Sequence, residues 1–498
     1  MKKVKSILLA SALLLCAPLA ACGGNAPTST KGTVQQGDKT IFPYSTSEGV
    51  YMGDVMPFYD DGVMNIYHLQ DRTGSLYMFY HPFSRLTTTD YVSYKDEGIA
   101  INFTEDIDSP DASLGTGSFI KGADGKYHCF YTGHPANAVE VIRHAVSSDN
   151  QKTWVKDESF NIRGTSNDFR DPYVYYDSTD ECYYMLVTTR KGDKGVIQQY
   201  KADSLDAASD GWTDNGTFFE NDEGTYNMEC PSYIEWNGFR YLAYSEQGDN
   251  RVTHYRYQTA DSDEWKKFNR DTIDSTGFYA GRLEKAGDKL YAFAWCARLD
   301  GGDTGAFDWG GNLVAHEIKQ EPDGSLRAVM IENVKNTFGN SVTYNRVNGE
   351  NVSDFKFDGA GFKAYGVEKL STNVTRMHFT VTLDSLDGDF GLTFGVNGDY
   401  DNRLGKNMLS FIGQKGRISC YNGVKNILRY GDEFTGINYA LETGRAYDAD
   451  IVIDGEILSL YFDNKIAFTT RFVGMQNKNF AFYSNGAKVQ IAGIKFYE

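Results

Sequence analysis

Cysteine is scarce in this sequence, and its spacing argues against two structural solutions. None of the seven cysteines forms a C-x-x-C pair, and no histidines stand at a matching spacing, so neither a disulfide framework nor a cysteine-based metal site is expected. Five cysteines remain beyond residue 22, which is an odd number. We therefore expect buried, small apolar side chains at Cys129, Cys182, Cys230, Cys296 and Cys420.

Basic charge is also in short supply. Lysine and arginine together number 49 against 67 aspartate and glutamate residues, which gives a formal net charge of -18. That charge repels nucleic acids and anionic membrane surfaces, but it leaves a neutral oligosaccharide or polysaccharide unaffected. We therefore expect a neutral glycan as the partner, no nucleic acid, and no requirement for a metal or another cofactor.

Proline is rare, at 10 residues, whereas glycine reaches 51 and tyrosine 34. This balance is typical of many short strands joined by tight turns, and it predicts an all-β protein. With 498 residues the chain is long enough for two all-β domains.

Long apolar runs are missing except near the N-terminus. Lys2, Lys3 and Lys5 precede the apolar segment 7–15, which is too short to span a bilayer. The combination predicts an export signal over residues 1–21.

The end of this signal carries a further pattern. Leu19-Ala20-Ala21-Cys22 resembles the lipobox of bacterial lipoproteins, which implies cleavage before Cys22 and its lipidation. The alternative is an ordinary cleaved signal with an incidental cysteine. The polar segment 22–40 predicts a flexible tether. We expect the folded body to lie at the bacterial cell surface or in the periplasm, anchored to a membrane through the lipid.

A hairpin pattern recurs five times in the first two thirds of the chain. In one copy, the strand-like segment 169–176 leads through a polar turn to the tyrosine-rich segment 182–187. The five turns are spaced by about 50 to 63 residues, near the period of a four-stranded propeller blade. They are Asp61-Gly62, Asp124-Gly125, Asp177-Ser178-Thr179-Asp180, Asn237-Gly238 and Gly287-Asp288. We predict a five-bladed β-propeller over residues 41–335.

Counting back eight or nine residues from each turn selects one position per blade. These positions are Asp54, Thr116, Asp171, Glu229 and Tyr279. Because the innermost strands of a propeller line its axis, equivalent positions converge there although they are distant in sequence. The sequence therefore predicts one pocket that contains three carboxylates.

The pattern changes in the last third of the chain. Residues around 333–345 predict a short helical connection. Beyond it, segments such as 377–383, 448–455 and 457–462 alternate apolar and polar residues, as strands with one solvated face do. We predict a C-terminal β-sandwich over residues 336–498.

Four short motifs follow one another along the chain. They are Gly117-Ser118 before an aromatic hairpin, Arg170-Asp171-Pro172, Glu229-Cys230-Pro231 and Phe278-Tyr279-Ala280. In this order and spacing they resemble glycoside hydrolase family 32, the fructan-cleaving invertases, inulinases and levanases. The resemblance covers the chain from about residue 45 to its end and implies a five-bladed propeller followed by a β-sandwich.

The first motif of that family departs from its usual form. The family has Trp-Met-Asn-Asp-Pro-Asn-Gly, whereas this chain reads Tyr51-Met52-Gly53-Asp54-Val55-Met56-Pro57. The aspartate is retained, but the neighbours that help to hold the sugar are replaced, so the exact substrate stays open. A family 43 type of arabinosidase or xylosidase, which shares the fold and the three acids but inverts configuration, is the alternative.

The resemblance also implies roles for the acids. Asp54 corresponds to the nucleophile, Glu229 to the general acid/base, and Asp171 to a stabiliser that binds sugar hydroxyls. Cleavage needs one carboxyl that can hold a proton, and the neighbours Met228 and Cys230 indicate apolar surroundings of that kind for Glu229. The nucleophile must stay ionised to attack the anomeric carbon.

Other residues are expected to bind the substrate or to line its pocket. They are Arg170, Tyr279, Thr116, Ser118, His81 and Phe83, with Trp295 and Trp309 as candidates for sugar stacking. Arg170 is expected either to pair with Asp171 or to contact the substrate. Ordinary packing is the alternative for Tyr279, His81, Phe83 and the two tryptophans.

Together these observations predict a glycosidase that cleaves β-fructosidic bonds with retention of configuration. Two alternatives stay open: an inverting arabinosidase or xylosidase, and a non-catalytic glycan-binding lipoprotein on a hydrolase scaffold.

Overall fold

The computed structural model describes residues 40–43, 50–72, 81–135, 138–221, 224–248, 251–299, 307–342, 354–367, 374–396, 405–424, 430–472 and 479–498. The expected export signal, Cys22 and nearly all of the expected tether lie outside these residues. Within the described part of the chain, no helix is both long enough and apolar enough to cross a membrane.

The regular secondary structure of the described chain is almost entirely strand, as its composition predicts. The first strands are β1 (Val50–Asp60), β2 (Val63–Arg72), β3 (Phe83–Thr88), β4 (Lys95–Ile101), β5 (Ser113–Lys121), β6 (Tyr127–His134), β7 (Val141–Ser147), β8 (Val155–Lys156), β9 (Phe169–Asp177), β10 (Cys182–Lys191), β11 (Lys194–Ala202) and β12 (Thr213–Glu220). They are followed by β13 (Asn227–Trp236), β14 (Phe239–Gln247), β15 (Thr253–Thr259), β16 (Tyr279–Ala286), β17 (Lys289–Leu299), β18 (Phe307–Gln320) and β19 (Leu326–Val329). A 3-10 turn, η1 (Ser209–Gly211), precedes β12. The five turns predicted from the sequence all separate paired antiparallel strands.

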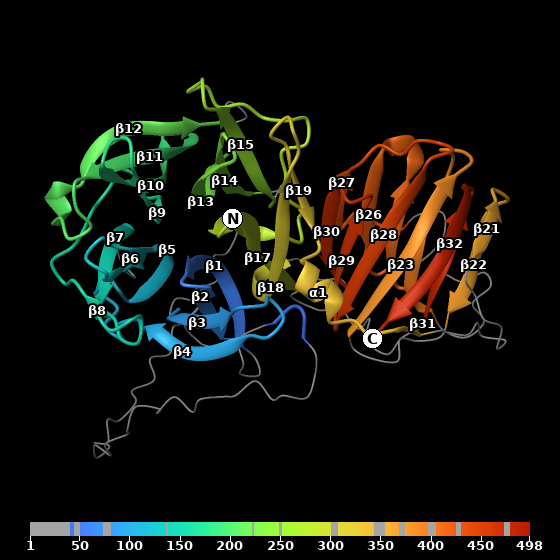
Figure 1. Cartoon of the computed structure of the whole chain (residues 1–498), viewed down its shortest axis with the longest axis horizontal. Coiled ribbons are helices and arrows are strands. Elements are labelled where there is room, and N and C mark those ends of the chain that lie inside the picture. The colour runs from blue at the N-terminus through green and yellow to red at the C-terminus, as the bar shows by residue number, and fades with distance from the viewer. Residues whose placement is uncertain are drawn as a thin grey trace, which may run out of the picture. The chain divides into compact units, whose positions relative to one another are not determined.

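These strands form antiparallel sheets that close into a ring. β5 to β8, β9 to β12 and β13 to β15 are separate sheets, while β1 to β4 and β16 to β19 are joined through the pair Met52 and Gly311. The first strand of each group contacts the next: β1 contacts β5, β5 contacts β9, β9 contacts β13, β13 contacts β16, and β16 contacts β1. Figure 1 shows β1, β5, β9 and β13 around a common centre.

Each of these five inner strands bulges at the same place. The register with the second strand of the hairpin shifts after Gly53, Gly115, Arg170, Glu229 and Tyr279. The first bulged residues are therefore Asp54, Thr116, Asp171, Cys230 and Ala280. Three of them, Asp171, Cys230 and Ala280, have left-handed backbones with φ of 58°, 55° and 54°. Bulges re-aim side chains and are common beside active sites.

The bulges correct the positions inferred from counting residues. Asp54, Thr116 and Asp171 are equivalent, as predicted, but Glu229 and Tyr279 lie one residue earlier, at the last paired position. The number of residues between a position and its turn does not show where the strand bulges. The site therefore takes side chains from the first bulged residue of some inner strands and from the residue just before the bulge of others.

Two further sheets follow the helix α1 (Glu332–Asn336), which is shorter than the predicted connection over 333–345. One sheet contains β20 (Ser341–Val342), β21 (Phe355–Asp358), β23 (Val374–Leu383), β28 (Ala446–Asp454), β29 (Ile457–Phe462), β30 (Ile466–Arg471) and β32 (Lys488–Tyr497). The other contains β22 (Phe362–Val367), β24 (Asp389–Val396), β25 (Asn407–Ile412), β26 (Arg417–Tyr421), β27 (Thr435–Asn438) and β31 (Asn479–Asn485), with the 3-10 turn η3 (Gly413–Lys415) after β25. Side chains of both sheets, such as Phe379 and Phe482, share one apolar core, which makes this a β-sandwich.

The expectation of one solvated face fails for β29, in which every residue is buried, and every residue of β30 is buried as well. Their second face packs against the ring. Asp274 accepts hydrogen bonds from the Thr469 amide, at 2.8 Å, and from the Thr469 hydroxyl, at 2.5 Å. His316 contacts Asp274 Oδ2 through Nε2 at 2.9 Å and the Tyr461 hydroxyl through Nδ1 at 3.1 Å. The side chains of Asp274 and His316 are fully buried.

We expect Asp274→Ala to lower the free energy of unfolding by roughly 3 kcal/mol, because it leaves buried donors on His316 and Thr469 without an acceptor. Denaturant unfolding followed by tryptophan fluorescence checks this value. Asp261→Ala, which removes an exposed carboxylate, is the matched control and should change stability by less than about 0.5 kcal/mol. Equal stability of the two variants would contradict a stabilising role for this contact.

All five described cysteines are free and buried, as predicted.

Candidate active site

The Asp54 carboxylate lies in the bulge of β1 and is held at both oxygens. Oδ2 accepts a hydrogen bond from the Thr116 hydroxyl at 2.6 Å, and Oδ1 accepts one from Trp295 Nε1 at 3.0 Å. Two donors from two different strands fix the carboxylate in one orientation. A nucleophile requires such an arrangement, because its attacking oxygen must be aimed before the substrate arrives.

Glu229, on β13, lies in ionic surroundings. Oε1 accepts hydrogen bonds from Arg170 Nε at 3.3 Å and Nη2 at 2.9 Å, and Oε2 accepts one from the Tyr279 hydroxyl. The expectation of apolar surroundings was therefore wrong. Successive residues of a strand face opposite sides, so Met228 and Cys230 do not enclose the carboxylate between them; each belongs to a different apolar cluster.

Asp171 lies in the bulge of β9 and is 3% exposed. Its Oδ2 accepts a hydrogen bond from the Cys230 amide at 2.9 Å, and its own amide donates to the Thr132 hydroxyl at 2.9 Å. These bonds connect β9 to the neighbouring groups on both sides.

The buried position of Asp171 changes its protonation. Burial raises the pKa of Asp171 to about 7; the Arg170 guanidinium opposes this shift, and the charges of Glu229 and Asp54 add to it. Asp171 can therefore hold a proton near neutral pH.

Arg170 is 9% exposed and binds several carboxylates. Besides Glu229, it donates from Nη1 to Asp168 Oδ1 at 2.6 Å and to Glu140 Oε2 at 3.3 Å. The ion pair expected between Arg170 and Asp171 is thus replaced by a pair with Glu229. Arg170 and Asp171 are neighbours in a bulged strand, and their side chains bond to different groups.

Two of the expected lining residues reach the acids. The Thr116 hydroxyl donates to Asp54, and the Tyr279 hydroxyl donates to Glu229. Burial and the Glu229 charge raise the pKa of Tyr279 well above its usual range, so the phenol stays protonated and remains a donor.

The other expected lining residues lie further away. The Ser118 hydroxyl accepts a hydrogen bond from the Val174 amide at 3.0 Å, so it joins two inner strands. Phe83 is completely buried in an apolar core, which agrees with the packing alternative and not with a place in the substrate pocket. The His81 ring lies 4.6 Å from the half-buried ring of Trp309.

Trp295 has a role that the sequence did not reveal. Its ring is fully buried, packs edge-on against Tyr279 at 5.4 Å between ring centroids, and donates to Asp54. Trp295 therefore connects two of the acids. It binds Asp54 directly and packs against Tyr279, which binds Glu229. Trp295 is placed beside the acids because it pairs with Tyr279 across β16 and β17, and this pairing is seen in the structure.

Two glycines beside the bulges admit side chains from elsewhere. A Cβ at Gly53 would lie 2.0 Å from the Trp309 ring, and one at Gly115 would lie 2.2 Å from His134 Nε2. His134 in turn lies 3.4 Å from Glu140. A glycine inside a strand often marks such a close approach, and this signal could have identified both contacts.

Two open clefts lie at the other ends of the inner strands. One of about 570 Å³ surrounds Asp60, Arg85 and Lys121, and one of about 640 Å³ surrounds Trp236, Arg240 and Lys285. Neither contains Asp54, Asp171 or Glu229. We take the group of three acids as the candidate active site, because catalytic chemistry requires converging reactive groups.

Comparison with known proteins identifies the family of this chain. A model of the glycosyl hydrolases family 32 N-terminal domain matches residues 55–319, a little over half of the chain, and begins one residue after Asp54. No curated protein sequence matches the chain.

Solved structures resemble the whole fold at low sequence identity. Sucrose-6-phosphate hydrolase from Lactobacillus gasseri has a TM-score of 0.69 at 17% identity, over 92% of both chains. Fructan 1-exohydrolase IIa from Cichorium intybus has a TM-score of 0.68 at 15% identity, over 93% of this chain and 98% of its own. The β-fructofuranosidase from Schwanniomyces occidentalis has a TM-score of 0.65 at 16% identity, over 92% and 97%. At such identities the likeness establishes the fold alone.

An all-β fold with three acids gathered in one site, in a chain that matches a glycosyl hydrolase domain, defines a glycosidase. The chain belongs to glycosyl hydrolase family 32.

Proposed function

We propose that this protein hydrolyses β-fructosidic bonds of fructans or sucrose-type oligosaccharides by a retaining, double-displacement mechanism. The observation that carries the proposal is the group of Asp54, Asp171 and Glu229 in a family 32 chain, in which each carboxylate accepts a hydrogen bond from a neighbouring inner strand or its hairpin. The structural relatives include a sucrose-6-phosphate hydrolase and a fructan 1-exohydrolase, and two solved complexes hold sucrose and 1-kestose. These names support a small fructose-containing substrate.

Asp54 acts as the nucleophile. Trp295 and Thr116 hold its carboxylate, so one oxygen can attack the anomeric carbon as the bond to the leaving oxygen breaks. The product of this step is a fructosyl ester of Asp54. Water then attacks the same carbon and releases the aspartate, and the two inversions together give retention.

Glu229 acts as the general acid and then as the base. It protonates the leaving oxygen in the first step and takes a proton from water in the second. Both of its oxygens accept hydrogen bonds from Arg170 and Tyr279. A substrate that draws Arg170 away from Oε1 would free this oxygen to carry the proton that the first step needs.

Asp171 and Arg170 bind and orient the sugar. A carboxylate that accepts hydrogen bonds from ring hydroxyls stabilises the transition state as positive charge develops on the sugar ring. Arg170 precedes Asp171 in the chain and binds Glu229, so it connects the two acids. We therefore assign to Arg170 the role of positioning these acids against the sugar.

The same proposal extends to the architecture and the location. The closed ring of five inner strands supports a five-bladed β-propeller over residues 41–335, followed by a β-sandwich over 336–498. The N-terminal sequence supports an export signal over 1–21, lipidation at Cys22 and a tether over 22–40, which would anchor the enzyme to a bacterial membrane at the cell surface or in the periplasm.

A substrate panel tests the proposed function. We expect the purified protein to release fructose from sucrose, sucrose 6-phosphate, inulin or levan, and no sugar from arabinan or xylan, as measured by chromatography. Release of arabinose or xylose would instead establish the family 43-like activity. Fructan binding without any product would establish a binding protein.

A further inference from the structure

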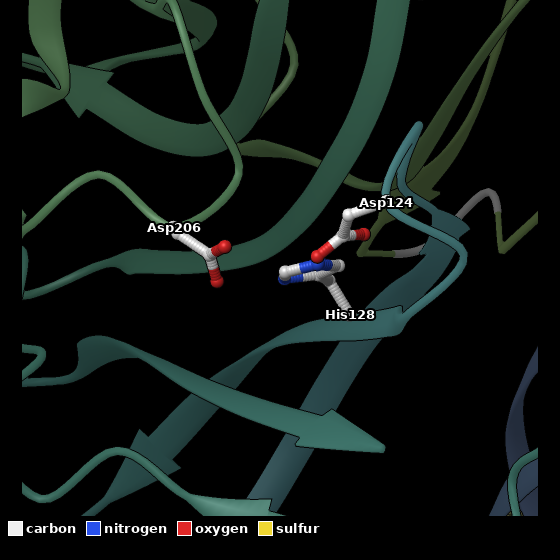
Figure 2. Close-up of side chains that lie close together, drawn as sticks. All are labelled: Asp124, His128 and Asp206. Atoms are coloured by element: carbon white, nitrogen blue, oxygen red, sulfur yellow. The ribbon is translucent and has the colours of Figure 1, made fainter. Parts of the chain in front are cut away.

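A second group of ionisable side chains lies beyond the end of the inner strand β5. Asp124 is in the turn between β5 and β6, His128 is on β6, and Asp206 follows β11. One ligand atom from each of the three lies within 4.8 Å of the other two. Figure 2 shows the His128 ring between the two carboxylates.

His128 gives this group a feature that two surface aspartates alone lack. Its side chain is 1% exposed, and Nδ1 lies 3.0 Å from Nε2 of His144. Within the described residues, Nε2 of His128 makes no hydrogen bond. A Cβ on Gly122 would lie 2.7 Å from Asp124 Oδ1 and 3.3 Å from His128 Nε2, so both atoms border the same space beside Gly122.

The contact between His128 and His144 suits metal binding. With the proton on Nδ1, His128 donates to His144 and presents the lone pair of Nε2. A metal-bound histidine usually donates its other N–H to such an acceptor.

The two aspartates already form ion pairs with a cationic side chain. The Lys126 ammonium lies 2.8 Å from Asp124 Oδ2 and 3.3 Å from Asp206 Oδ2. The Lys126 side chain is 40% exposed, so it can turn into solvent and leave both carboxylates to another cation.

We propose that Asp124, His128 and Asp206 bind one divalent transition-metal ion such as Zn²⁺, which displaces Lys126. One imidazole nitrogen and two carboxylate oxygens are ligands that this class of ion accepts at about 2.0–2.2 Å, and water completes the coordination. Both aspartates are at least 40% exposed and can close on the ion. The ion would join the β5–β6 hairpin to the loop after β11, and so connect two neighbouring sheets of the ring.

Thermal unfolding of the full chain, stripped with a chelator and then titrated with ZnCl₂, tests this site. We expect about one ion per chain by equilibrium dialysis, and a rise in Tm of roughly 2–5 °C at 100-fold excess over the dissociation constant. Lys126→Ala should bind Zn²⁺ about tenfold more tightly, because the competing ammonium is gone. This gain is specific, since a merely structural lysine would leave zinc affinity unchanged.

Two exposed variants complete the test without disturbing the buried histidine. Asp124→Asn and Asp206→Asn should each abolish the rise in Tm, whereas Asp210→Asn, an exposed aspartate in the same loop as Asp206, should keep it. A rise that persists in Asp124→Asn and Asp206→Asn, or no rise in the wild type and Lys126→Ala, would overturn the proposal.

Discussion

Asp54→Asn will lower kcat on a fructosyl substrate by roughly 10³- to 10⁵-fold, which corresponds to about 4–7 kcal/mol of transition-state stabilisation. The amide cannot form the covalent intermediate, so the double displacement is lost. The fold should survive. The asparagine oxygen can still accept the hydrogen bond from Trp295, and its NH₂ can donate to the Thr116 hydroxyl, which accepts as readily as it donates.

Steady-state kinetics and circular dichroism separate the two effects in this variant. Asp60→Asn is the matched control, because it makes the same change on the same strand, at the end that pairs with Lys121. We expect this control to retain near wild-type turnover. Equal turnover of Asp54→Asn and Asp60→Asn would remove Asp54 from the mechanism.

Asp171→Asn will lower kcat/KM by roughly 10²- to 10³-fold and will stabilise the fold at neutral pH. The activity falls because the sugar loses a charged acceptor at the transition state. The backbone should tolerate asparagine, which adopts the left-handed conformation more readily than other residues with a side chain. The Cys230 amide also keeps an oxygen acceptor.

The stability that Asp171→Asn gains should increase with pH, because the pKa of Asp171 is raised in the folded chain. The pKa of Asp171 rises from its usual 3.8 to about 7 in the folded chain, so folding takes up a proton between these values. The contribution of Asp171 to stability is therefore fully present below about pH 4 and is lost as pH rises to 7. Asp171→Asn removes this loss, so its advantage should grow from pH 4 to 7 and reach the order of a few kcal/mol.

Denaturant unfolding at pH 5, 6, 7 and 8 measures this difference between Asp171→Asn and the wild type. Asp60→Asn, which changes a partly exposed carboxylate that pairs with Lys121, should show no such trend. Parallel pH profiles of the wild type and Asp171→Asn would contradict a buried, proton-holding Asp171.

The hairpin repeat made much of the ring predictable. Asp-Gly and Asn-Gly turns followed by tyrosine-rich strands are local signals, and the strands formed where they indicated. The convergence of Asp54, Asp171 and Glu229 followed from the repeat, because similar units around a centre bring equivalent residues together. The location of the bulges did not follow, since they depend on pairing between strands.

The surroundings of each acid were harder to predict. The contact of Arg170 with Glu229 joins residues 59 apart, and the contact of Trp295 with Asp54 joins residues 241 apart. Such pairs leave no local signature in the sequence. The same holds for the contact of Asp274 with Thr469 on β30, which joins residues 195 apart. The sequence neighbours of Glu229, Met228 and Cys230, instead indicate apolar surroundings that the structure does not show.

Trapping the fructosyl-enzyme tests the central claim most directly. Glu229→Gln should slow release of the intermediate, so mass spectrometry after brief exposure to a fructosyl substrate with a good leaving group should find one added fructosyl group on the peptide that contains Asp54. With methanol as acceptor, the wild type should yield the methyl fructoside in the configuration of the substrate. An unmodified peptide together with a methyl fructoside of inverted configuration would contradict the account.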